Sequence, residues 1–179
     1  SLDGKYVVYD EQVRTNTSRQ NDLYYVTVGP DGEFSKPIPY LTTSFDEWEG
    51  RFIPEPNPKW LAYRSNETDS YEVYLQSFPV PGNKIRVSTN GGRFPAWSPD
   101  GKELYYMAPD DRLMAVSVKP MGNSLQLSTP QPLFQLPPAN NAYPYDVSRD
   151  GKRFLVSDPT QTTTPLTIVT NWPSLLAKH

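Results

Sequence analysis

Ser98, Asp100 and Lys102 lie within the segment Trp97-Ser98-Pro99-Asp100-Gly101-Lys102 and are residue types from which serine hydrolases build active sites. A serine nucleophile needs a general base, most often histidine, within hydrogen-bond reach. The one histidine of the chain is its last residue, His179, and the nucleophile-elbow spacing Gly-x-Ser-x-Gly does not occur. The sequence therefore predicts no catalytic residue and no enzyme activity for this chain.

The same residues are those of a tight hairpin turn. Pro99 sets φ at the second position of a type I turn, and Asp100 suits the third. Gly101 then supplies the left-handed conformation that closes a hairpin with a bulge. The hydroxyl of Ser98 can accept a hydrogen bond from a nearby backbone N–H. Turn chemistry accounts for every residue of the segment, so we interpret it as structural.

Variants of this turn recur along the chain. Ser1-Leu2-Asp3-Gly4-Lys5 and Ser148-Arg149-Asp150-Gly151-Lys152 are close copies, and Asn57-Pro58-Lys59 is a degenerate one. The four lysines are separated by 54, 43 and 50 residues, which is the spacing of four-stranded blades in a β-propeller. Because proline cannot adopt a positive φ, the degenerate copy is predicted to turn differently, without a left-handed residue at position 58.

The composition favours strands over helices. Twenty prolines spread along 179 residues exclude long helices, and the frequent tyrosine, valine and threonine residues suit strands. We predict an all-β fold of about three to four propeller blades, each of four antiparallel strands, with blade segments 1–43, 44–89, 90–136 and 137–179. Fourteen strands are expected, the innermost at 52–54, 94–97 and 143–147. The first blade lacks its inner strand and the last its outer strand, so the fold is predicted to be part of a larger propeller or to be completed by oligomerisation.

Several function classes find no support in the sequence. The net charge of −3 is spread over both signs, so no basic surface for nucleic acid is expected. No apolar run is long enough to cross a membrane, and no membrane contact is predicted. The chain has no cysteine, no histidine cluster and no phosphate-binding glycine loop, so neither a metal site nor a cofactor is expected.

The turn segment Trp97-Ser98-Pro99-Asp100-Gly101-Lys102 resembles the repeat of TolB-type, WD-like propellers, and Asp150-Gly151-Lys152 matches it in part. The ending, 165–172 followed by Leu175-Leu176, resembles the propeller regions of bacterial receptor-type serine/threonine kinases. The resemblance implies an interaction or sensor domain with a protein or peptide partner, in an extracytoplasmic (periplasmic) location. The alternative is the propeller of a prolyl-oligopeptidase-like serine hydrolase whose catalytic domain lies outside this chain.

Candidate binding residues lie where loops are expected to enter inner strands. Arg51 and Arg93 occupy matching Gly-Arg-Phe segments, and the acidic–aromatic residues Glu47, Trp48 and Glu49 precede the first of them. In a propeller these segments, with the loops at 43–51 and 90–93, lie on the face opposite the repeated turns, where recognition residues are commonly found. We predict that this rim binds a peptide or a cationic partner. Ordinary solvated loops with Arg–Glu pairing remain the alternative.

Overall fold

The structure is a computed structural model, and it describes residues 1–14, 19–138, 143–157 and 167–170. Within these residues the fold is all-β: fifteen strands and no helix. The paired strands in this part of the chain run antiparallel to each other. The chain forms two compact units, unit 1 (Ser1–Pro95) and unit 2 (Ala96–His179).

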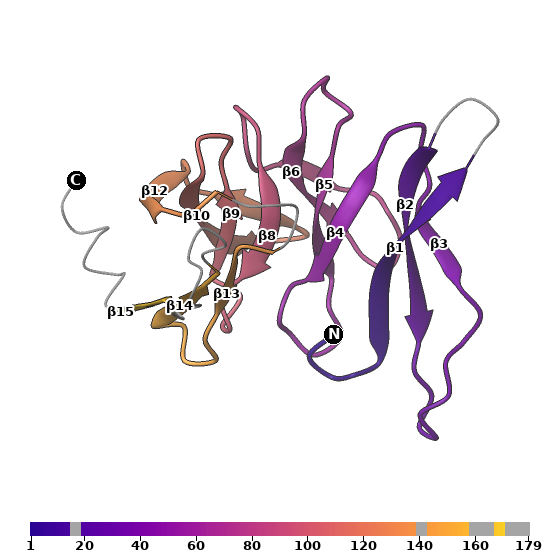
Figure 1. The fold of residues 1–179 in the computed structure, drawn as a ribbon. Coiled ribbons are helices and arrows are strands. Elements are labelled where there is room, and N and C mark those ends of the chain that lie inside the picture. The colour runs from indigo at the N-terminus through magenta and orange to yellow at the C-terminus, as the bar shows by residue number, and fades with distance from the viewer. Residues whose placement is uncertain (15–18, 139–142, 158–166, 171–179) are drawn as a thin grey trace. The chain divides into compact units, whose positions relative to one another are not determined.

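Unit 1 contains two sheets (Figure 1). The first has the order β1-β2-β3 and the second the order β4-β5-β6-β7, so each strand pairs with the next along the chain. The strands are β1 (Tyr6–Arg14), β2 (Arg19–Thr27), β3 (Ile38–Leu41), β4 (Glu47–Phe52), β5 (Trp60–Ser65), β6 (Glu72–Ser77) and β7 (Lys84–Arg86). This up-and-down order is that of propeller blades.

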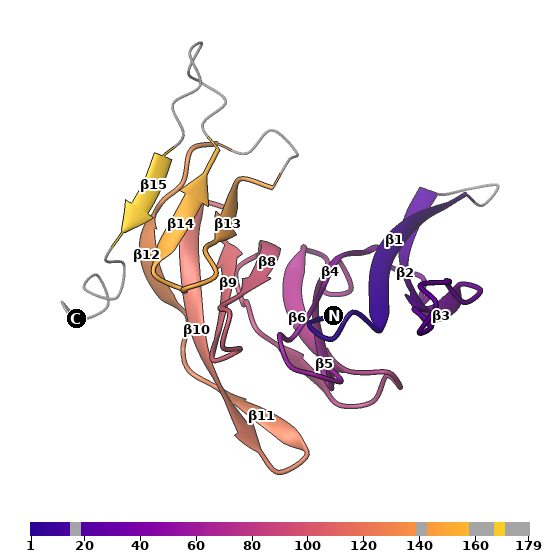
Figure 2. The same cartoon turned by 90° about the horizontal axis from the view of Figure 1, so that it is seen from below.

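Two further sheets follow the same pattern. The order is β11-β10-β9-β8 in one, where β12 also pairs with the long strand β10, and β13-β14-β15 in the other. Figure 2 shows β10 running on into the hairpin with β11. The strands are β8 (Arg93–Trp97), β9 (Glu103–Met107), β10 (Arg112–Met121), β11 (Ser124–Leu127), β12 (Gln131–Gln135), β13 (Tyr145–Val147), β14 (Arg153–Val156) and β15 (Thr167–Thr170).

The predicted fold class is confirmed, with two corrections to the strands. Strand β11 was not predicted; it exists because Gly122, at φ 60°, turns the end of β10 back on itself. The inner strand predicted at 52–54 instead runs from Glu47 to Phe52, through residues predicted as a loop. Its pattern is hidden in the sequence because the side chains that it buries are the carboxyls of Glu47 and Glu49.

The repeated turns have one geometry. In the third copy the Gly101 N–H donates to the Ser98 carbonyl (2.9 Å) at φ 68°, and the Ser98 hydroxyl donates to Asp100 Oδ1 (2.7 Å). The Glu103 N–H donates back to Ser98 Oγ (2.9 Å). The copies beginning at Ser1 and Ser148 repeat all three bonds and the positive φ at glycine. These bonds engage the serine and aspartate, which confirms the structural interpretation.

The degenerate copy turns differently, as predicted. The left-handed residue is Asn57, at φ 55°, one position before Pro58. Its N–H donates to Asp3 Oδ2 (3.2 Å), and the Lys59 N–H donates to Glu55 Oε1 (3.0 Å). The carboxylates of Asp3, in the first copy, and Glu55, in the degenerate copy, thus accept backbone hydrogen bonds where serine and aspartate do so in the other copies.

An aromatic core joins the two sheets of unit 1. Phe78 packs against Phe52 and Tyr25 at ring-centroid distances of 4.8 and 5.0 Å, and against Tyr6 and Tyr40 at 5.1 and 5.5 Å. The rings meet edge to face or tilted, the arrangements that aromatic pairs prefer. The Tyr40 hydroxyl donates to the Ser77 carbonyl (2.8 Å). This core fixes β1 and β2 against β4, the strand that carries Glu47, Trp48 and Glu49.

Candidate functional site

Strand β4 bends at Glu49, a non-glycine residue in the left-handed conformation (φ 63°). The register with β5 shifts between Trp48 and Arg51, so the bend is a β-bulge. Phe94 (φ 57°) occupies the equivalent place in β8. Phe94 lies four residues before Ser98, whose N–H donates to the Glu103 carbonyl at the start of the β8–β9 hairpin. In the same way, Glu49 lies four residues before Ile53, whose N–H donates to the Trp60 carbonyl. Left-handed residues with large side chains are uncommon and costly, and they cluster at functional sites.

The bulge delivers the Glu49 carboxylate to two partners. Arg64 Nη1 on β5 lies 3.1 Å from Oε1, and the backbone N–H of Phe94 donates to Oε2 at 2.6 Å. The side chain of Glu49 is 7% exposed. Burial raises the pKa of Glu49, and the charge of Arg64 and the Phe94 N–H only partly offset this effect. The buried Glu49 carboxylate therefore links β4 to both β5 and β8.

Aromatic side chains surround Arg64. Its guanidinium carbon lies 4.5 Å from the centroid of the Tyr71 ring and 5.2 Å from that of Trp48, within the range of cation–π attraction. The Tyr71 hydroxyl donates to Asp46 Oδ2 (3.0 Å), and Asp46 Oδ1 accepts the Asn21 N–H (2.9 Å). We call Asp46, Trp48, Glu49, Arg64 and Tyr71 the acidic–aromatic rim. Tyr71 is its most exposed member, at 39%.

Glu47 lies beside this rim and is 2% exposed. The Thr43 hydroxyl donates to its Oε1, whereas Oε2 has no hydrogen-bond partner among the described residues. Burial raises the pKa of Glu47 to about 7, and the negative charges of Asp22 and Glu67 add to the shift. The Glu47 carboxyl is therefore close to half-ionised near neutral pH.

Negative charge accumulates around the rim. Burial raises the pKa of Asp22, the Gln20 side chain opposes this through a hydrogen bond, and the charges of Asp46 and Glu11 raise the pKa further. The carboxyls of the first two sheets thus repel one another in a partly desolvated region. A fixed cluster of one sign focuses the field and attracts groups of the opposite charge.

The raised pKa of Glu47 predicts a pH-dependent stability. A carboxyl with a higher pKa when folded contributes stability that is fully present below its unfolded pKa, near 4.5, and is lost as the pH rises through about 7. We expect the free energy of unfolding to fall over this range by on the order of 2 kcal/mol. Urea unfolding at several pH values measures it. Glu47→Gln imitates the protonated carboxyl, so it should flatten this dependence; an unchanged profile would contradict the assignment.

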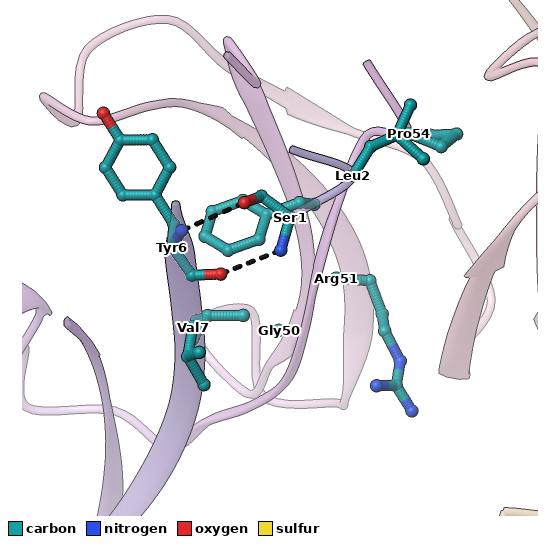
Figure 3. A pocket seen from close by; sticks show the side chains of 9 residues that line it. Ser1, Leu2, Tyr6, Val7, Gly50, Arg51 and Pro54 are labelled. Carbon is teal, nitrogen blue, oxygen red and sulfur yellow. Dashed lines mark hydrogen bonds between the residues drawn. The ribbon is translucent and has the colours of Figure 1, made fainter. Parts of the chain in front are cut away.

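A cavity of about 360 Å³ lies between the start of β1 and the end of β4 (Figure 3). Apolar and polar groups both line it, from Ser1, Leu2, Tyr6, Val7, Val8, Gly50, Arg51, Phe52 and Pro54. The Arg51 side chain extends away from Leu2 and Pro54 in Figure 3. Gly50 is required here, since a Cβ at this position would lie 2.9 Å from a methyl of Val8.

The five predicted binding residues lie on β4 and β8. Glu47, Trp48 and Glu49 follow one another on β4, and the Glu49 carboxylate reaches the N–H of the residue after Arg93. The Arg93 guanidinium lies 5.5 Å from the Phe94 ring centroid. Arg51 is instead among the cavity residues.

Sequence reasoning missed Arg64, Tyr71 and Asp22 as members of this region. Arg64 belongs to the rim because the β4–β5 register places it opposite Trp48. Asp22 belongs to the region because its strand, β2, packs beside β4 of the next sheet. The sequence carries no local signal for either arrangement.

Other kinds of site find little support in the structure. Among the described residues, no group of three or more His, Cys, Asp and Glu side chains is arranged to hold a metal ion. The described part of the chain likewise contains no helix long and apolar enough to span a membrane.

The sequence matches no protein-family model and no curated protein, whereas the fold matches solved structures. A protein described as a candidate 6-phosphogluconolactonase from Bacteroides uniformis has a TM-score of 0.53 and 16% identity, over 92% of this chain and 55% of its own. TolB from Acinetobacter baumannii has a TM-score of 0.51 and 17% identity, over 95% of this chain and 51% of its own. The periplasmic gluconolactonase PpgL of Pseudomonas aeruginosa has a TM-score of 0.51 and 15% identity, over 94% of this chain and 55% of its own.

These neighbours show the fold, and the chain spans about half the length of each. They confirm the β-propeller fold predicted from the repeated turn. They also contradict the prediction that this chain has no enzyme activity, because proteins named as lactonases share the fold over more than nine-tenths of the chain. The absence of a serine–histidine pair excludes only one catalytic solution, and propellers host several unrelated functions.

Proposed function

We propose that this chain is a recognition domain of the β-propeller class, and that the acidic–aromatic rim of unit 1 binds a basic, extended segment of a protein partner. The observation that carries the proposal is the gathering of carboxyls around two aromatic rings. Asp22, Glu47 and Glu49 all have raised pKa values because they are desolvated together. Tyr71 and Trp48 contact Arg64, the ion-pair partner of Glu49.

The rim offers a basic side chain two kinds of attraction. A lysine or arginine placed near Asp46 would face a carboxylate and an aromatic face at once, because Tyr71 bonds to Asp46 through its hydroxyl. The arrangement already holds one such cation, Arg64, between Trp48 and Tyr71. In addition, the indole N–H of Trp48 is buried without a hydrogen-bond partner among the described residues.

The wider setting of the domain is also a proposal. The TolB neighbour and the resemblance of the repeated turn support an interaction domain, and the periplasmic lactonase among the neighbours supports an extracytoplasmic location. The sensor region of a bacterial receptor-type kinase is the setting we favour on the resemblance of the chain ending. The propeller of a prolyl-oligopeptidase-like hydrolase is the alternative. The coding sequence on either side distinguishes them, since the first requires an upstream kinase and the second a downstream hydrolase domain.

Peptide binding tests the proposed function. A fluorescent lysine- and arginine-rich peptide should bind the chain, weaken as salt is raised, and bind far better than the matching glutamate peptide. Tyr71→Ala and Asp46→Asn should each weaken binding about tenfold, as expected for residues at the centre of an interface. Anisotropy titration measures the affinities.

Glu33→Gln is the matched control, because Glu33 is exposed in the turn between β2 and β3 and lies outside the rim. It removes one negative charge and should leave the affinity within about twofold of the parent. Thermal unfolding shows whether each variant is folded. Equal binding of the basic and acidic peptides, or equal losses in Glu33→Gln and Asp46→Asn, would overturn the proposal.

A further inference from the structure

The segment between β3 and β4 ties the Glu47 carboxyl to the acidic–aromatic rim. The Thr43 hydroxyl donates to Glu47 Oε1 and accepts a hydrogen bond from the N–H of Phe45 (3.1 Å). The next residue along the chain, Asp46, belongs to the rim, and Glu47 itself stands between Asp46 and Trp48. A negative charge on Glu47 therefore lies within the stretch of chain that forms part of the rim.

Gln20 connects the same segment to β2. Its side-chain Nε2 donates to the Thr43 carbonyl (2.8 Å) and to Asp22 Oδ1 (3.2 Å). Thr43 is thus hydrogen-bonded to Glu47 directly and to Asp22 through Gln20. Both carboxyls are buried, at 2% and 5% exposure, so burial disfavours a negative charge on either of them.

The charged groups that act on Glu47 from the neighbouring elements are acidic. Asp22 of β2 and Glu67 of the turn after β5 both raise the pKa of Glu47. Tyr63 of β5 is also coupled to Glu47: burial raises the pKa of Tyr63, and the charges of Glu67 and Glu47 add to this effect. Lys84 of β7 forms its ion pair with Glu67, at 2.5 Å. A cation that a ligand brings to the rim would therefore be a new counter-charge for Glu47.

We propose that the Glu47 carboxyl is a proton switch for the acidic–aromatic rim: the rim binds a basic segment more tightly when Glu47 is ionised than when it is protonated. The inference rests on the proposed function and adds its regulation. Arg64, the rim's own cation, is paired with Glu49 instead (3.1 Å). A basic side chain of the partner would stabilise ionised Glu47 across a buried region, where attraction between charges is stronger than in water.

The coupling between proton and partner is reciprocal. Burial raises the pKa of Glu47 to about 7, so both protonation states are populated near neutral pH. If ionised Glu47 binds the segment about fivefold more tightly than protonated Glu47, the bound segment must lower the pKa of Glu47 by about 0.7. The same ionisation destabilises the free protein, and the bound cation offsets that loss.

The affinity for a basic peptide as a function of pH tests the switch. The probe is a fluorescent arginine-rich peptide with blocked ends, because its charge stays constant between about pH 5.5 and pH 8. At constant ionic strength the parent chain should bind it about fourfold more tightly at the higher pH, with the rise centred a little below pH 7. Glu47→Gln imitates the protonated carboxyl, so its affinity should stay at the low-pH value of the parent throughout.

Two further variants make the test specific. Glu33→Gln removes an exposed carboxyl outside the rim and should keep the pH dependence of the parent. Thr43→Val removes the hydroxyl that donates to Glu47; because this hydrogen bond lowers the pKa of Glu47, its loss should move the rise in affinity to higher pH. Burial lowers the pKa of the Ser1 amine, and any contribution of this amine to the pH dependence would persist in Glu47→Gln.

The outcomes separate the switch from the recognition site itself. If the parent chain bound the peptide equally at both pH values, or if Glu47→Gln kept the full pH dependence, the switch would be refuted and the proposed function would stand. Failure of the peptide to bind at about pH 8 would refute both. The ¹³C signal of the Glu47 carboxyl gives a second readout, since its titration midpoint should fall by about 0.7 pH unit in saturating peptide.

Discussion

Replacing Phe78 by alanine is expected to lower the free energy of unfolding of unit 1 by about 3–5 kcal/mol. Phe78 is 6% exposed and contacts aromatic rings from both sheets, including Tyr6 and Phe52. Its removal would leave a cavity that these rings cannot fill without losing their contacts with one another. Equilibrium urea unfolding measures the loss, and the exchange of the Leu23 and Leu61 amides assigns it to unit 1.

The rim should be affected by the same substitution. Because the aromatic core fixes β2 against β4, its loss would separate Asp46 from Asn21 and lower the affinity for a basic peptide. Phe34→Ala is the control, since the Phe34 side chain is 66% exposed; it should change the stability by less than about 0.5 kcal/mol. A small effect of Phe78→Ala, similar to that of Phe34→Ala, would contradict the proposed role of the core.

Arg64→Met is the second substitution with a large expected effect, a loss of about 3–5 kcal/mol. It leaves the buried Glu49 carboxylate without its ion-pair partner, 3.1 Å away in the parent protein. The methionine keeps much of the apolar stem that packs beside Trp48 and Tyr71, so the loss reports on charge more than on volume. Denaturation at neutral pH, followed by circular dichroism, measures it.

The pH dependence of this loss has a definite sign. The pKa of Glu49 is already raised, and removal of Arg64 raises it further because the main opposing charge is gone. A carboxyl with a raised folded pKa contributes stability at low pH that is lost as the pH rises, so the deficit of Arg64→Met should shrink in acid. The double variant Glu49→Gln with Arg64→Met should recover most of the stability.

An exposed ion pair supplies the matched control for that substitution. Arg112 pairs with Asp110 at 3.1 Å, and both side chains are more than half exposed. Arg112→Met should therefore cost less than about 1 kcal/mol. If Arg64→Met and Arg112→Met had equal effects, Glu49 and Arg64 would not form the buried link between strands that is described here.

The turns could be predicted from the sequence because their determinants are local. Ser98, Asp100 and Gly101 interact within six residues, so the segment carries its own geometry, and so do its two close copies. The exclusion of a left-handed residue at Pro58 followed from the proline ring alone. The spacing of these motifs is why the all-β propeller fold could be inferred from four lysine positions.

The rim could be predicted only in part, because its determinants are tertiary. Glu47 and Glu49 were expected as binding residues in a loop at 43–51, and carboxylates are rarely buried. The fold buries them by pairing Glu49 with Arg64 and by the left-handed bulge, and neither feature has a local sequence signal. The register that brings Arg64 opposite Trp48 depends on the bulge itself.

The proposed recognition surface is tested most directly by mapping a bound basic peptide in two-dimensional ¹H–¹⁵N NMR spectra of the chain. The signals of the Trp48 indole N–H and of the Asp46 and Tyr71 backbone amides are expected to shift as the peptide is added, because these residues belong to the acidic–aromatic rim. Shifts confined to the turn at Gly29 and Glu33, with the Trp48 indole unchanged, would contradict it.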